Sequence, residues 1–171
     1  MSDNVYLGNP NLKKANTQIQ FSAKQIEEFV KCKNDPVYFA KKYVKIVSLD
    51  EGLVPFQPYK FQEKLIKRFH RERFNICKMP RQTGKSTTVV SYLLHYAVFN
   101  DSVNIGILAN KAATARELLG RLQTAYENLP RWMQQGIIAW NKGSLELENG
   151  SKILAASTSA SAVRGMSFNI L

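Results

Sequence analysis

Residues 74–99 read FNICKMPRQTGKSTTVVSYLLHYAVF. The first five, Phe74 to Lys78, form a short apolar run that predicts a buried strand. From Ser86 to Phe99 the apolar residues recur at helical spacing and predict a helix. The residues expected to face inward on it are Val89, Val90, Leu93, Leu94 and Ala97. A strand that passes through a polar loop into a helix indicates an α/β fold, with parallel strands and right-handed crossovers.

The loop between this strand and helix has the residues that a triphosphate site needs. Such a site uses inward-facing backbone N–H groups, a helix N-terminus, a lysine for the phosphates and a hydroxyl for Mg²⁺. Gly84 lets the backbone approach the phosphates, Lys85 reaches the β and γ oxygens, and Ser86 can coordinate the metal. The loop therefore predicts ATP and Mg²⁺ as ligands. The predicted nucleotide-binding residues of this loop are Pro80, Arg81, Gln82, Thr83, Gly84, Lys85, Ser86 and Thr87.

The tripeptide Gly84-Lys85-Ser86 is a weak signal by itself. Composition alone gives a glycine, lysine and serine or threonine in this order in roughly one chain in ten of this size. The first glycine of the usual phosphate loop is also missing, because Met79 stands there. Its place between an apolar strand and an apolar-faced helix supports the phosphate site over an ordinary strand–helix turn.

Downstream, the pattern continues the α/β alternation. Val103 to Ala109 predicts a second buried strand, and residues 112–128 predict a helix. Leu145–Glu148 and Lys152–Ala155 predict a hairpin around a type I′ turn at Asn149-Gly150. A last apolar strand begins at Phe168.

Upstream, the signals are shorter. The polar residues 1–20 predict a flexible leader. Ser22 with Gln25 predicts a capping box, and Asp35-Pro36 a second helix start. Residues 45–49 predict a strand, 52–58 a loop and 59–71 a helix.

Composition limits the class of protein. Lys and Arg number 24 against 13 Asp and Glu, a formal charge of +11 that favours nucleic acid over a membrane surface as partner, although a solvated basic surface is an alternative. No apolar run reaches the roughly 18 residues of a membrane helix or resembles a signal peptide, so we expect a soluble intracellular protein. Cys32 and Cys77 lack metal-site spacing, and Cys77, in an apolar run, is expected in the core.

Several blocks together carry a resemblance to one family. They are PRQTGKS (80–86), VPFQPYKFQEKL (54–65), VNIGILANK (103–111), LPRWMQQGI (129–137), WNKGSLELENGSKI (140–153) and STSASAVRGMSFNI (157–170). They resemble the T4-like phage terminase large subunits, in order, over about residues 45–171. The resemblance implies a P-loop NTPase of the ASCE/RecA-like class, with a mainly parallel central sheet flanked by helices. Residues 21–171 would be the N-terminal portion of its ATPase domain.

The resemblance also implies roles for single residues. Gln62 is similar in place to the glutamine that reads adenine, and a helix-surface glutamine is the alternative. Arg81 would sense the γ-phosphate or stabilise charge in the transition state, and the alternative is a surface arginine or an ion-pair partner. Arg164 would be presented to the nucleotide of a neighbouring subunit, although an arginine that caps a helix end or binds a backbone carbonyl is equally compatible.

For the whole protein, the resemblance implies a DNA-packaging motor that couples ATP hydrolysis to movement of double-stranded DNA into the capsid. Its partners would be the portal protein, the small terminase subunit and further copies in a ring, in the host cytoplasm and docked on the procapsid. The strand from Phe168 would continue into an Asp-Glu pair that holds Mg²⁺ and orients water. The sequence stops at Leu171 before this pair and before a nuclease domain, so we expect the chain alone to be inactive and to expose an apolar sheet edge.

Other candidates have plainer interpretations. His70, His95, Trp132 and Trp140 are expected to serve in packing or on the surface, because no nucleophile or ligand set accompanies them. Glu146 and Glu148 are expected on the solvated side of a strand. The basic run Lys64, Lys67, Arg68, Arg71 and Arg73 fits either phosphate contact or a solvated helix face. Two other functions stay open from the residues: a superfamily 2 helicase-like translocase, and a non-catalytic DNA- or portal-binding module.

Overall fold

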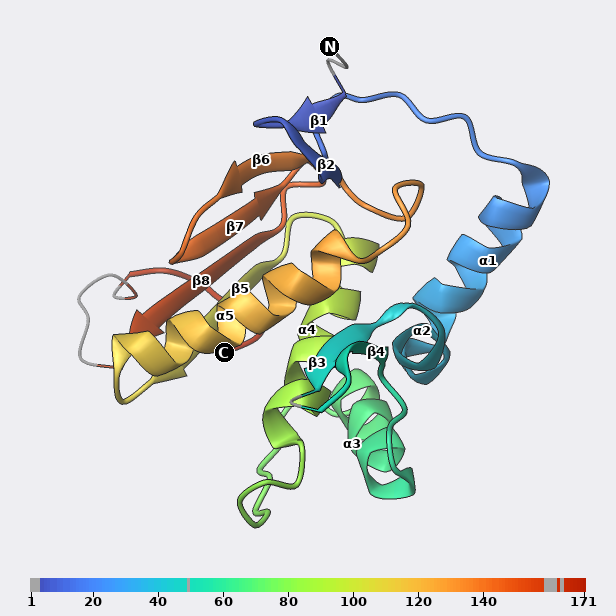
Figure 1. The fold of residues 1–171 in the computed structure, drawn as a ribbon. Coiled ribbons are helices and arrows are strands. Elements are labelled where there is room, and N and C mark those ends of the chain that lie inside the picture. The colour runs from blue at the N-terminus through green and yellow to red at the C-terminus, as the bar shows by residue number, and fades with distance from the viewer. Residues whose placement is uncertain (1–3, 49, 159–162, 164) are drawn as a thin grey trace.

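The computed structural model describes residues 4–48, 50–158, 163 and 165–171 (Figure 1). The helices are α1 (Ala23–Asn34), α2 (Pro36–Tyr43), α3 (Lys60–Arg71), α4 (Lys85–Phe99) and α5 (Ala112–Glu127). The strands are β1 (Val5–Tyr6), β2 (Asn9–Lys13), β3 (Lys45–Ser48), β4 (Gly52–Pro55), β5 (Asn104–Ala109), β6 (Ile137–Trp140), β7 (Ser144–Leu147) and β8 (Lys152–Ser157). The chain is therefore an α/β protein, as the sequence predicts.

Four strands form the main sheet, in the order β5-β8-β7-β6. Strand β8 runs parallel to β5, whereas β7 is antiparallel to both β8 and β6. The prediction of a mainly parallel sheet is therefore wrong for the described part, where the sheet is mixed. The reason is local, because a connection as short as the one between β7 and β8 can only join antiparallel strands.

The free side of β5 pairs with the end of the chain. Ile170 forms an isolated parallel bridge with Ile105, and the Gly106 N–H donates to the Ile170 carbonyl at 2.8 Å. An added Cβ at Gly106 would lie 2.7 Å from Leu171 Cδ1, so a side chain here would require Leu171 to shift. The predicted strand from Phe168 is therefore present only as this bridge.

The helices stack in layers on the sheet. Helix α5 packs against β5 and β8, α4 packs against α5, and α2 and α3 pack against α4 (Figure 1). Because α4 lies between helices, it is apolar on nearly all sides, and Leu94, Ala97 and Val98 are buried. The predicted helix starts are confirmed: Ser22 and Gln25 form the capping box of α1, and the Asp35 carboxylate accepts from Val37 N and Tyr38 N at 2.9 Å each.

Two paired strands lie within residues 5–13, which corrects the prediction of a flexible leader for this part of residues 1–20. Strands β1 and β2 form a hairpin at the β6 end of the sheet, where Lys14 bridges Ile137 (Figure 1). Leu12 is buried in the core, and Lys13 pairs with Glu148 at 2.7 Å. Lys13 and Lys14 contact Glu148 and Ile137, which lie more than 120 residues away in the sequence. The polar local composition therefore could not predict these contacts.

The predicted strand at Phe74–Lys78 is also wrong. This segment has no regular structure, and Phe74 and Ile76 are 83% and 101% exposed. Cys77 is exposed rather than in the core. An apolar run becomes a strand only where another strand can pair with its backbone, and none of the described strands lies beside this one.

Two smaller expectations also change. Gly52–Pro55, expected in a loop, pairs with β3 as strand β4. The turn between β7 and β8 is not type I′, because φ is positive at Gly150 (79°) but not at Asn149. The Gly150 N–H donates to the Leu147 carbonyl at 3.0 Å, so the turn centres on Glu148-Asn149.

His95 is a buried histidine at the meeting point of four helices. Its Nε2 lies 2.9 Å from the Cys32 carbonyl of α1, and its ring contacts those of Phe39 in α2 and His70 in α3. Its Nδ1 is buried and has no hydrogen-bond partner in the described part of the chain. The packing role expected for His95 fits this position.

Mild acid is expected to destabilise the protein through His95. Burial lowers the pKa of this imidazole from 6.5 to about 4. The unfolded chain therefore takes up the proton first, so stability is lost as pH falls from about 6.5 towards about 4, by about 2 kcal/mol near pH 5. Urea unfolding near pH 7 and pH 5 measures this loss, and His95→Gln should remove most of it. A wild-type pH dependence in His95→Gln would contradict the prediction.

Candidate nucleotide-binding site

The predicted phosphate loop is a bend that leads directly into α4, at the opposite end of α4 from the sheet connection (Figure 1). Two of its residues have left-handed backbone conformations, Gln82 with φ of 61° and Gly84 with φ of 72°. Such conformations are uncommon for a residue with a side chain and turn the chain sharply. Gly84 is the N-cap of α4, so the bend places the free N–H groups of the first helical turn at the loop.

Gly84 is required here for two reasons. Its φ of 72° is strained for any residue with a Cβ, and an added Cβ would lie 2.5 Å from Gln62 Nε2. The loop backbone therefore touches the side chain of α3 directly.

The Lys85 ammonium turns back over the loop. Its Nζ donates to the Met79 carbonyl at 3.1 Å and also to the Pro80 carbonyl. The Pro80 carbonyl accepts in addition from the Thr83 hydroxyl at 3.0 Å. A positive charge is thus held within the bend by neutral carbonyls, and an anionic oxygen would be a stronger partner for it.

The first turn of α4 carries three hydroxyl groups in succession. Ser86 and Thr87 are half-buried, and Thr88 is buried, with its hydroxyl donating to the Gly84 carbonyl at 2.9 Å. The Thr88 contact fixes the start of the helix. The sequence motif did not predict this hydrogen bond. The only sign of it is a threonine four residues after the N-cap, a spacing that allows this bond in any helix.

Gln62 lies on α3, outside the loop in the sequence, and the structure places its side chain against the loop. It is 3% exposed, and its Nε2 donates to the Thr83 and Gly84 carbonyls at 3.3 and 3.5 Å. Its Oε1 accepts from the Tyr59 N–H at 2.9 Å and so caps α3. The alternative interpretation, that Gln62 is a helix-surface glutamine, is therefore wrong.

Of the two predicted arginines, the structure describes only Arg81. Arg81 is exposed next to Gln82. Arg164 lies outside the described residues. The basic run on and after α3 is exposed throughout.

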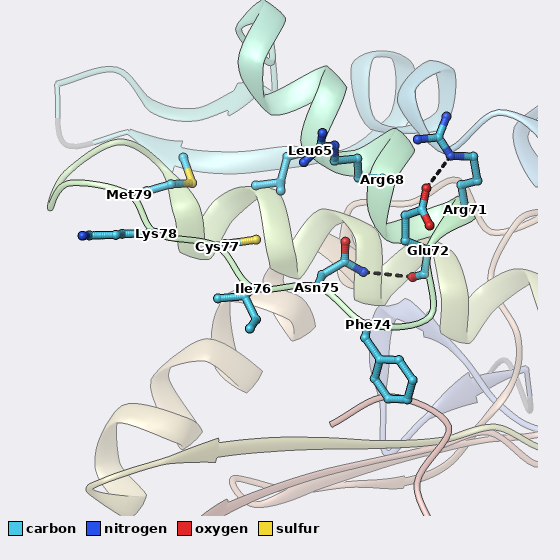
Figure 2. A pocket seen from close by; sticks show the side chains of 10 residues that line it. All are labelled: Leu65, Arg68, Arg71, Glu72, Phe74, Asn75, Ile76, Cys77, Lys78 and Met79. Carbon is cyan, nitrogen blue, oxygen red and sulfur yellow. Dashed lines mark hydrogen bonds and ion pairs between the residues drawn. The ribbon is translucent and has the colours of Figure 1, made fainter.

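A cavity of about 450 Å³ adjoins the loop without including it (Figure 2). It lies between α3 and the exposed segment after it, and its wall ends at Met79, where the loop begins. Arg71 Nε pairs with the Glu72 carboxylate at 2.7 Å, and Asn75 Nδ2 donates to the Glu72 carbonyl at 2.9 Å (Figure 2). The lining mixes basic and apolar side chains, Arg68 and Lys78 beside Phe74 and Ile76. The phosphate loop is thus an open bend beside this cavity.

The remaining candidates take structural places. Trp132 packs against Tyr43, and Trp140 against Tyr126, as expected for anchoring residues. Glu146 pairs with Lys152 at the surface. Glu148 is less exposed than expected, since it accepts from Gly136 N at 2.6 Å and Asn16 N at 2.9 Å and pairs with buried Lys13. In the described ranges, no three His, Cys, Asp or Glu residues form a group that could hold a metal ion.

None of the described helices is both long and apolar enough to cross a membrane. The structure is similar to the crystal structure of the HK97 bacteriophage large terminase, with a TM-score of 0.64 and 16% sequence identity. The similarity covers 80% of this chain and 29% of that chain, so this chain spans less than a third of its length, and at this identity it concerns the fold alone. The family model "Terminase large subunit, T4likevirus-type, N-terminal" matches residues 76–171, more than half of the chain. With the loop, α4, β5, α5 and the β7–β8 hairpin all inside that range, the chain belongs to the T4-like terminase large subunits, the family involved in phage DNA packaging.

Proposed function

We propose that the loop at residues 80–87 binds ATP with Mg²⁺ and that the chain is the nucleotide-binding part of a DNA-packaging motor. The observation that carries the proposal is the position of Lys85, whose ammonium lies in a bend at the N-terminus of α4. A lysine, a glycine at positive φ and a helix N-terminus in one loop form a binding site for phosphate.

The residues of the loop fit a triphosphate with its metal. Lys85 would exchange its bonds with the Met79 and Pro80 carbonyls for bonds with phosphate oxygens. Ser86 would hold Mg²⁺, which supplies neutralisation of the phosphate charge when bound. Arg81, an exposed residue of the loop, would contact the terminal phosphate. Arg164 stays a proposal for contact with a neighbouring subunit.

The P-loop NTPase fold of the ASCE/RecA-like class is part of this proposal. The parallel bridge between Ile105 and Ile170 supports it, since it adds a second parallel neighbour to β5, beside β8. The exposed apolar segment Phe74–Lys78 is compatible with a sheet that extends further on the β5 side, beyond Ile170.

For the whole protein, we propose ATP hydrolysis coupled to translocation of double-stranded DNA, in a ring that works with the portal and the small terminase subunit. Family membership supports this proposal, and the formal charge of +11 is compatible with a DNA partner.

Nucleotide binding is the direct test. We expect the 171-residue chain to bind a fluorescent ATP analogue saturably, with inorganic tripolyphosphate as a competitor. Chelating Mg²⁺ should weaken wild-type binding about tenfold, and Ser86→Ala should bind with equal affinity whether Mg²⁺ is present or chelated. Titration of both proteins with and without EDTA measures this. Absence of saturable binding in the wild type would contradict the proposed function, and a full Mg²⁺ effect in Ser86→Ala would contradict the metal assignment.

A further inference from the structure

Helix α3 has one strongly basic face. Its five basic residues recur three or four positions apart, and at about 100° per residue all five lie within about 100° of the helix circumference. The opposite face turns towards α2 and α4, with Ile66 buried and Phe69 packed against Tyr92 of α4. Helix α3 lies beyond α4, on the side away from the sheet (Figure 1). We call the exposed basic face the α3 stripe, which consists of Lys60, Lys64, Lys67, Arg68 and Arg71.

The α3 stripe is poorly neutralised by the rest of the described chain. Glu63, the acidic residue of α3, pairs at 2.7 Å with Lys41 of α2, which lies outside the stripe. Within the stripe only Arg71 forms an ion pair with a described residue, the exposed Glu72. With five basic residues and one acidic residue, 5 − 1, α3 has a net charge of +4, more than a third of the +11 of the chain.

This arrangement is unfavourable for the helix by itself. Cations three or four positions apart on a helix repel one another, and every member of the α3 stripe has such a neighbour. The helix dipole favours cations in the last turn, at Arg68 and Arg71, but disfavours Lys60 in the first. A helix face that meets only solvent commonly alternates charges of both signs. An anionic partner that ran along the whole face would remove the repulsion.

We propose that the α3 stripe binds the phosphate backbone of double-stranded DNA without reading its sequence. The proposal rests on DNA as the partner in the proposed function and adds the surface that contacts it. From Lys60 to Arg71 the helix rises about 16 Å, a length along which one strand of a duplex places about five phosphates. A rigid row of cations therefore matches a rigid row of phosphates.

The composition of the stripe favours a duplex over a single strand. Three of its residues are lysines, which act as point charges towards phosphate and carry no sequence information. Single-stranded DNA is bound largely through bases that stack on aromatic rings, and none of the five residues of the stripe is aromatic.

Two triple variants test the surface at equal net charge. Glutamine is a good helix former and removes the charge of an exposed lysine, so both variants are expected to keep the fold. The stripe variant combines Lys60→Gln, Lys64→Gln and Lys67→Gln. The matched control removes three exposed lysines of α1 and of the turn between β6 and β7, and combines Lys24→Gln, Lys33→Gln and Lys142→Gln.

Fluorescence anisotropy of a labelled duplex of about 30 base pairs, titrated without nucleotide at several salt concentrations, measures binding. The 171-residue wild type is expected to bind, and the stripe variant to bind at least about tenfold more weakly near 0.1 M salt. The slope of log affinity against log salt should fall by about 3 in the stripe variant, because three phosphate contacts are lost. The control should stay within about threefold of the wild type and keep its slope.

Three results would overturn the assignment. Equal losses in the stripe variant and the control would mean that DNA responds to net charge alone, and a wild type that did not bind the duplex would have no such surface. Tighter binding of a single strand of the same length, or equal competition by polyglutamate, would assign the stripe to another polyanion. The ATP affinity of the stripe variant should stay within about threefold of the wild type. If the wild type did not bind ATP, the proposed nucleotide site would fail, while the duplex titration would still decide for or against the stripe.

Discussion

Lys85→Met is expected to weaken ATP binding by at least about 100-fold, the largest effect of any single change at the loop. A charge-assisted hydrogen bond contributes about 1.5–3 kcal/mol, and the lysine would make such bonds to phosphate oxygens. The free protein already holds the ammonium within the bend, 3.1 Å from the Met79 carbonyl, so little reorganisation precedes binding. Methionine keeps an unbranched side chain as long as the lysine stem but removes the ammonium and its charge. Titration with a fluorescent ATP analogue measures the change.

Lys78→Met provides the matched control for this experiment. Lys78 is exposed, lies seven residues before Lys85 and contributes the same charge to the same segment. Its removal should change ATP affinity less than about threefold, since a solvent-exposed charge outside the loop acts only through a screened field. Equal losses in the two variants would mean that ATP responds to net charge alone, and the loop assignment would then be wrong.

Glu148→Gln is expected to lower the free energy of unfolding by about 3 kcal/mol, although the residue lies far from the loop in the sequence. Its partner Lys13 is 9% exposed, and Glu148 itself is 23% exposed. Burial alone would raise the pKa of Glu148, but the hydrogen bonds from Lys13, Gly136 N and Asn16 N hold it below its usual value. An amide at this position would leave the Lys13 ammonium buried without a counter-charge and would turn a donor towards other donors.

Glu146→Gln is the natural comparison for this change. Glu146 pairs with Lys152 at 2.9 Å, but here the side chains are 31% and 56% exposed. Its loss should cost less than about 1 kcal/mol, because water screens an exposed pair. Urea unfolding of both variants near pH 7, followed by circular dichroism, measures the difference. Similar small effects for both would mean that the N-terminal hairpin does not depend on the Lys13–Glu148 pair.

Family membership removes one of the functions that the residues alone left open. The match to the terminase large subunits covers residues 76–171, including the loop and α4, so the chain is not a superfamily 2 helicase-like translocase. The tripeptide Gly84-Lys85-Ser86 could not make this distinction, since many ATPases share it.

The sequence by itself determined the elements whose signals are local. The capping box at Ser22, the N-cap at Asp35 and the apolar periodicity of α4 and α5 predicted helices that the structure has to within two residues. Strand β5 followed from its continuous apolar run. In each case neighbouring residues carry the information, because a cap or a helical face depends on positions three or four apart. The positions of Gly84 and Lys85 at the start of α4 were predictable for the same reason.

Only the tertiary structure decided what depended on a distant partner. The apolar run at Phe74–Lys78 is exposed, whereas Leu12 and Lys13 of the polar N-terminal segment are buried, because pairing and burial are set by which strands lie beside each segment. Gln62 became part of the site through a contact across 21 residues, and Glu148 became an anchor through one across 135. A residue's own type fixes what it can bond with. The folded chain alone determines what lies within reach.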